Sequence, residues 1–134
     1  EPLTARVAED AYAEAGITVD DLDVVELHDA FSVAELLYYE ALGLCGFGEA
    51  PGLLRSGDTR RAGRCAVNRG GGLLARGHPI GATGLAQVVE VVEWLRDPPD
   101  HDGSRASTGL THCTGGGITG YDHAACSIHV LVGG

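Results

Sequence analysis

One glycine-rich stretch, residues 70–84 with the sequence GGGLLARGHPIGATG, constrains the fold of this chain more than any other feature. The glycines at 70–72 have no Cβ, so the backbone there can turn through positive φ or let another group approach closely. An apolar helical pattern follows over residues 85–95. His78 lies between the two features, so the sequence predicts an imidazole presented at the start of a buried helix.

The N-terminus of a helix gives that imidazole a chemical meaning. Its unpaired N–H groups and partial positive charge disfavour an imidazolium and favour an anion or developing negative charge. A neutral His78 in that place can accept a proton. The simpler interpretation is a glycine turn that feeds a core helix, with His78 as a polar cap.

Length and charge limit the class of protein. The 134 residues suffice for one domain with its own core, and residues 1–134 are expected to form a single domain. With 9 basic and 19 acidic residues the net charge is −10, which argues against a nucleic-acid or anionic-membrane surface. No apolar run is long enough to span a bilayer. Four cysteines without a C-x-x-C pair, and no signal peptide, favour a cytoplasmic protein.

Periodicity and turn residues predict alternating helices and strands. Helices are expected over residues 3–15, 33–42 and 85–95, and a loop over residues 43–57. Strands are expected over residues 22–27, 65–68, 106–112 and 118–131. This order indicates a layered α/β domain.

Residues that carry chemistry follow three of the predicted strands. His28 and Asp29 follow the first strand, His78 follows the second, and Cys113 follows the third, just before the glycines at 115–117. Functional side chains in open α/β sheets gather at strand ends. One histidine after a strand is usually a satisfied turn residue, but three such positions predict a common site.

Three blocks of sequence carry a resemblance to a known family. They are His-Asp-Ala-Phe at 28–31, Gly-His-Pro at 77–79 and Cys-Thr-Gly-Gly-Gly at 113–117. Together they resemble the C-terminal half of the thiolase superfamily, and the first is similar to the His-Asp-Cys-Phe block of its sterol-carrier-protein-type branch. The resemblance implies a thiolase-fold half, with a layered mixed β-sheet and buried and flanking helices. The other half of that five-layered molecule would lie outside this chain.

The resemblance also implies roles for individual residues. His78 would activate a nucleophilic cysteine and, with His28, line the oxyanion hole for a thioester carbonyl. Cys113 would be the acid/base cysteine, which requires a thiol that is partly ionised near neutral pH, and the Gly115 N–H would bind a second oxyanion. Substrate contacts are expected at four further positions: Asp29, Phe31, Gly77 and Gly116.

The family's nucleophilic cysteine lies in the first half, so this chain alone cannot complete a covalent cycle. Ala30 also replaces the cysteine of the sterol-carrier-type block. We therefore expect the second half of an enzyme that acts on an acyl-CoA thioester and cleaves or forms a carbon–carbon bond. Coenzyme A thioester is the expected substrate, without a covalently bound cofactor. The expected partner is an N-terminal thiolase half or other subunit, in a homo- or hetero-oligomer.

Two other functions stay open at this point. Some sterol-carrier-type relatives are retro-aldolases that cleave a β-hydroxyacyl-CoA with a small OB-fold partner subunit, and Tyr121 or His123 would then transfer the proton. A non-catalytic half that binds acyl-CoA or lipid, or completes an assembly, is the other. No metal site is expected from the late histidines and cysteines, because their spacing is not compact and Cys126 should point to the opposite strand face from His123 and His129.

Overall fold

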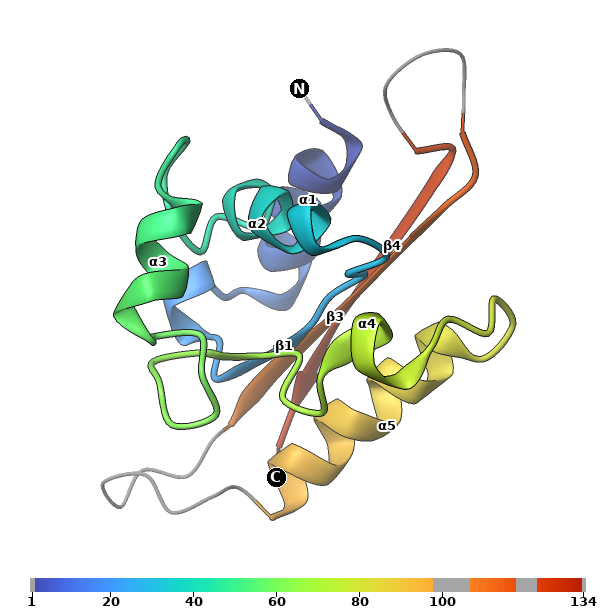
Figure 1. The fold of residues 1–134 in the computed structure, drawn as a ribbon. Helices are drawn as coiled ribbons and strands as arrows, with labels where there is room; N and C mark the ends of the chain where they lie inside the picture. The colour runs from blue at the N-terminus through green and yellow to red at the C-terminus, as the bar shows by residue number, and fades with distance from the viewer. Residues whose placement is uncertain (1, 98–106, 118–122, 134) are drawn as a thin grey trace.

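The computed structural model describes residues 2–97, 107–117 and 123–133, which form a four-stranded sheet between two layers of helices (Figure 1). The strands lie in the order β2-β1-β3-β4. Strand β1 (Val24–Glu26) is parallel to β2 (Ala66–Val67) and to β3 (Thr108–Gly115), whereas β4 (Ala125–Val132) is antiparallel to β3. The layered α/β domain with a mixed sheet is therefore confirmed.

Helices cover both faces of this sheet (Figure 1). One face carries α1 (Leu3–Ala15), α2 (Ser32–Ala41) and α3 (Ala50–Ser56), and the other carries α5 (Thr83–Arg96) with the short helix α4 (Gly72–Arg76) beside it. Each layer has its own buried apolar cluster. The larger cluster, on the side of α1 to α3, includes Leu22, Val25, Leu27, Tyr39, Leu42 and Leu110, and the smaller one, beneath α5, comprises Val24, Ala66, Val91, Trp94 and Leu95.

Helix α1 has the predicted bounds, and Gly16 ends it in the left-handed conformation at φ 68°. The predicted loop over residues 43–57 is wrong in part, because α3 occupies its second half. Proline and glycine near the start of α3 made this segment look irregular. Proline in the first turn of a helix costs no hydrogen bond, so Pro51 is compatible with a helix start.

Several predicted boundaries move. Strand β1 is shorter than predicted, α5 begins at Thr83, and α4 forms where only a turn was expected. Strand β3 continues to Gly115, so Cys113 lies within the strand and not after it. The reason is the antiparallel partner, since Cys113 pairs with Ser127 and Gly115 with Ala125. The first residues of the predicted last strand, 118–122, lie outside the described residues.

The expectation of a buried helix after His78 holds for only one face of α5. Gln87 and Val91 face the sheet and are buried, but Leu85 is 71 % exposed and Val89 is 53 % exposed. Helix α5 therefore presents an apolar face away from the sheet. Within the described parts of the chain, no helix has the length and apolar character needed to cross a membrane.

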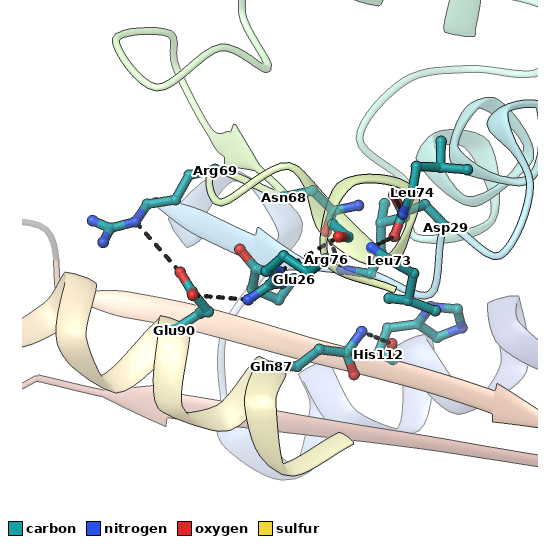
Figure 2. A network of polar contacts seen from close by, with 12 residues as sticks. Glu26, Asp29, Asn68, Arg69, Leu73, Leu74, Arg76, Gln87, Glu90 and His112 are labelled. Carbon is teal, nitrogen blue, oxygen red and sulfur yellow. Dashed lines mark hydrogen bonds and ion pairs between the residues drawn. The ribbon is translucent and has the colours of Figure 1, made fainter. Parts of the chain in front are cut away.

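Asp29 ties the end of β1 to α4 (Figure 2). Its Oδ1 accepts a hydrogen bond from the Leu73 N–H at 2.7 Å, and its Oδ2 accepts one from the Leu74 N–H at 3.4 Å. Gly72 has φ +62°, and a Cβ at this position would lie 2.1 Å from Asp29 Oδ2. The close approach predicted for the glycine run is therefore confirmed at Gly72.

Gly72→Ala is expected to lower the free energy of unfolding by roughly 2 kcal/mol, because the substitution strains the positive φ and displaces the Asp29 carboxylate. Denaturant unfolding followed by circular dichroism measures the change. Gly52→Ala in α3 is the matched control, since a Cβ there meets no atom within 4 Å. We expect the control to be neutral or stabilising by up to about 1 kcal/mol, and equal losses in both variants would contradict the prediction.

Candidate active site

A cavity of about 890 Å³ opens where β1 and β3 end, beside the first turns of α1 and α2. Apolar side chains of α2 and the loops make up much of its wall. His28, His78 and Cys113 also line it. The parallel strands β1 and β3 end at the same edge of the sheet, which places side chains from distant parts of the chain in one cavity.

Two of the imidazoles that line this cavity, those of His28 and His78, are in contact. The rings of His28 and His78 meet edge to face with their centroids 4.7 Å apart, and Cys113 Sγ lies 3.5 Å from His28 Nδ1. Each of these three residues was predicted to follow a different strand, and the structure brings them together.

His78 lies in the loop between α4 and α5, and its ring is held by the first turn of α5. Nδ1 is 2.8 Å from Thr83 Oγ1, and the Thr83 hydroxyl donates its hydrogen to the Pro79 carbonyl at 3.0 Å. Because a hydroxyl has a single hydrogen, His78 Nδ1 must be the donor to Thr83, as assigned from this network. In the tautomer that carries its hydrogen on Nδ1, Nε2 can accept a proton.

A buried histidine supports His28 from behind. The His28 N–H donates to His112 Nδ1 at 3.4 Å, which leaves His112 Nε2 as the donor to Thr4 Oγ1 at 3.2 Å. Burial lowers the pKa of His112 to about 3. Burial, and then the neighbouring His78 and His123, lower the pKa of His28 as well. Both rings are thus neutral at pH 7.

Cys113 differs from its expected state. Burial raises the pKa of the half-buried thiol above its ordinary value, a direction opposite to the partial ionisation near neutral pH that the family role implies. A protonated thiol in this position is a proton donor before it is a base.

A second polar cluster lines the same cavity. The Tyr38 hydroxyl lies 3.1 Å from Thr114 Oγ1 and 2.9 Å from His123 Nε2, and the Tyr38 ring contacts His112 at a centroid distance of 4.4 Å. Sequence reasoning placed Tyr38 in the apolar pattern of a helix and missed it. His123 was considered for proton transfer, whereas Tyr121 lies outside the described residues.

The remaining predicted site residues divide between cavity and scaffold. Phe31, Gly115 and Gly116 line the cavity. Asp29 is buried against the backbone of α4, and Gly77, at φ +83°, ends that helix; neither lines the cavity. In the parts of the chain that the structure describes, no group of three or more histidine, cysteine or acidic side chains is arranged to hold a metal ion.

Several curated proteins are similar to this chain. It is 44% identical over 129 residues to the "Benzoylsuccinyl-CoA thiolase subunit BbsB" of Thauera aromatica. The matched region covers 93% of this chain and 34% of that protein. It is 48% identical over 94 residues to "Sterol carrier protein 2" of Homo sapiens, and this match covers 70% of this chain and 17% of that protein. It is 44% identical over 114 residues to an "Acetyl-CoA acetyltransferase" of Methanothermobacter thermautotrophicus, and this match covers 84% of this chain and 30% of that protein. The chain thus spans about a third or less of these relatives.

The chain is also similar to a solved structure and matches a described family. The "Ltp2-ChsH2(DUF35) aldolase" has the same fold, with a TM-score of 0.74 over 97% of this chain and 31% of that chain at 23% identity. Residues 3–127 match the family described as "Thiolase C-terminal domain-like". These matches confirm the resemblance to the thiolase superfamily, and the chain belongs to the thiolase C-terminal domain-like family.

Proposed function

We propose that this chain is the C-terminal half of a thiolase-like enzyme that acts on an acyl-CoA thioester and cleaves or forms a carbon–carbon bond beside the thioester. The observation that supports this function is the meeting of His28, His78 and Cys113 in one cavity. Two relatives whose names state a CoA thiolase subunit and an acetyl-CoA acetyltransferase support it further.

The proposed cleavage begins on a cysteine supplied by the missing half. His78 Nε2 accepts the proton of that thiol, and the thiolate attacks the β-carbonyl carbon of a β-ketoacyl-CoA. The bond between the α and β carbons then breaks, and its electron pair passes to the α-carbon and the thioester oxygen. The His78 imidazolium and His28 donate hydrogen bonds to the resulting enolate oxygen.

Cys113 then completes the proton balance. Its thiol protonates the α-carbon, and the shortened acyl-CoA leaves. The Cys113 thiolate removes the proton of an incoming coenzyme A thiol, whose sulfur attacks the acyl group on the nucleophilic cysteine, with the Gly115 N–H facing the oxyanion. The bond between the acyl carbon and the cysteine sulfur then breaks, the new acyl-CoA leaves, and the cysteine thiolate takes back its proton from the His78 imidazolium. The raised pKa of Cys113 suits the first of these steps, because the proton donor must be protonated before cleavage.

The cavity wall supports an apolar acyl group as substrate and a partner protein as cover. Phe31, Val33, Leu37, Phe47 and Ile80 line the cavity with more than half of each side chain exposed. We propose that the N-terminal half or another subunit covers this rim in a homo- or hetero-oligomer. We propose a reducing cytoplasmic setting, because the four cysteines, all within the described residues, are thiols that are not joined in disulfides.

A retro-aldolase is the second candidate, and the cluster of Tyr38, Thr114 and His123 favours it. In this reaction a base removes the proton of a β-hydroxyl, the bond between the α and β carbons breaks, and the enolate is protonated, so no nucleophilic cysteine is needed. His123, hydrogen-bonded to Tyr38, is the candidate base. A small OB-fold protein is the proposed partner for this chemistry.

Turnover by the complete enzyme that contains this chain tests both candidates. We expect thiolysis of a β-ketoacyl-CoA that depends on free coenzyme A and on the cysteine-bearing half, measured by the appearance of the shortened acyl-CoA. Release of a ketone or aldehyde from a β-hydroxyacyl-CoA, without thiolysis, would establish the retro-aldolase instead. Binding of acyl-CoA by calorimetry with neither reaction would indicate a non-catalytic half.

A further inference from the structure

One guanidinium, that of Arg76, joins three elements (Figure 2). Arg76, the last residue of α4, donates from Nη2 to Glu26 Oε2 at 2.9 Å and from Nη1 to Glu90 Oε1 at 2.8 Å. Its Nε also reaches the Gly72 carbonyl at 3.4 Å. Glu90 also has a second cationic neighbour, because Arg69 Nε lies 3.9 Å from its Oε2. Arg76 therefore ties β1 and α5 to the end of α4.

Stability alone does not account for this arrangement. Glu26 is fully buried, and burial raises the pKa of its carboxyl to about 7 although the charge of Arg76 lowers it. Within the described residues, Glu26 Oε1 has no hydrogen-bond partner. Buried ion pairs are often no more stabilising than apolar side chains of the same volume. The two ion pairs also fix the relative positions of β1, α4 and α5.

The two ion-paired residues and the two ring-paired residues have the same spacing along their segments. Glu26 and His28 are two residues apart at the end of β1, and Arg76 and His78 are two residues apart at the end of α4. Arg76 contacts Glu26, and His78 contacts His28. The ion pair and the pair of rings are thus two cross-links between the same two segments.

Helix α5 repeats this pairing. Thr83 holds the ring of His78, and Glu90 holds the guanidinium of Arg76. Thr83 and Glu90 are seven residues apart, which is two helical turns, so both lie on the same side of α5. His78 and Arg76 are therefore each held from the β1 segment and from α5.

We propose that Arg76 is a positioning residue: by bridging Glu26 and Glu90 it fixes the loop after α4 so that His78 stays in register with His28 and Thr83. Arg76 does not line the large cavity, so it acts through His78 and not on the substrate. The proposal rests on the proposed function only in taking His78 as a group that reacts; the geometry is testable without turnover.

Arg76→Met in the complete enzyme tests the proposal. The substitution keeps most of the side-chain length and removes both anchors, so we expect kcat to fall at least about tenfold with KM changed less than about twofold. The ring C–H resonances of His28 and His78 should shift in NMR spectra. Arg76→Lys should recover part of the loss, because an ammonium cannot reproduce the fork of a guanidinium.

Two further variants keep the result interpretable. Arg64→Met removes an exposed ion pair with Asp20, 3.5 Å long, and should leave kcat and the ring resonances unchanged. Should Arg76→Met fail to fold, Glu90→Gln decides, since Glu90 is partly exposed and the substitution removes the negative charge from one of the two anchors. We expect it to lower kcat by about threefold or more, at constant KM.

The outcomes separate this proposal from the proposed function. When His78→Ala lowers kcat, normal kcat in folded Arg76→Met, or in Glu90→Gln when it decides, overturns the positioning role, and so does a loss confined to KM. If His78→Ala removes turnover while Arg76→Met is normal, only the positioning role fails. If His78→Ala is fully active while the ring resonances still shift in Arg76→Met, the positioning role stands and the proposed function fails.

Discussion

Replacing His78 with alanine is expected to lower kcat of the complete enzyme by about 10³-fold, because the variant loses both a general base and an oxyanion donor. The fold should survive. His78 lies in a loop, its ring is exposed, and it contacts the His28 ring and the Thr83 hydroxyl, so its removal opens no cavity in the core. Single-turnover thiolysis and thermal unfolding measure the two effects separately.

His129→Ala is the matched control for this variant. His129 is an exposed histidine on β4 whose ring approaches Thr111 at 3.4 Å, and it does not line the cavity. We expect the control to keep its kcat. Activity of His78→Ala within about tenfold of the unmodified enzyme would remove His78 from the mechanism.

Cys113→Ser is expected to lower kcat by about 10²-fold or more, because a hydroxyl keeps the size of the thiol but is a far weaker acid. Labelling with iodoacetamide gives an independent measurement. Since burial raises the pKa of Cys113, little thiolate is present at neutral pH, and the labelling rate should climb steeply as the pH rises above the ordinary thiol range. Cys65, whose pKa burial raises to about 12, should stay unreactive.

The same variant discriminates between the two chemistries. Full activity in Cys113→Ser would show that the thiol is not the proton donor. If Tyr38→Phe then lost activity, the cluster with Thr114 and His123 would be the proton-transfer group, and the retro-aldolase would replace the thiolase as our proposal. Tyr121→Phe extends this test to the residue predicted from the sequence.

The sequence predicted the helices and strands whose ends are determined by residues close to those ends. Helix α1 has a clear apolar period and a glycine that ends it, and it was placed at its observed bounds. Helices α3 and α4 were missed because each begins among glycine or proline, which suggests turns, although tertiary contacts such as the Asp29 carboxylate at α4 stabilise them. The end of β3 depends on its antiparallel partner, which no local pattern indicates.

The residues of the candidate site also differ in whether nearby sequence could predict their role. His28, His78 and Cys113 lie in short motifs, so their residue types and order were sufficient to predict that they meet. Thr83, His112 and Tyr38 support or extend the site through contacts between segments far apart in sequence, and in the sequence they look like ordinary helix and strand residues. The charged residues that tie α4 to its neighbours look like a solvated surface until the fold buries one of them.

The matched spacing of the ion pair and the ring pair has a consequence for how this protein can change during evolution. Each pair depends on two residues separating its members along both segments, from Glu26 to His28 and from Arg76 to His78. Inserting or deleting one residue in either segment would turn the imidazole away from its partner even if every side chain were retained. The lengths of these two short segments are therefore constrained independently of which side chains they carry.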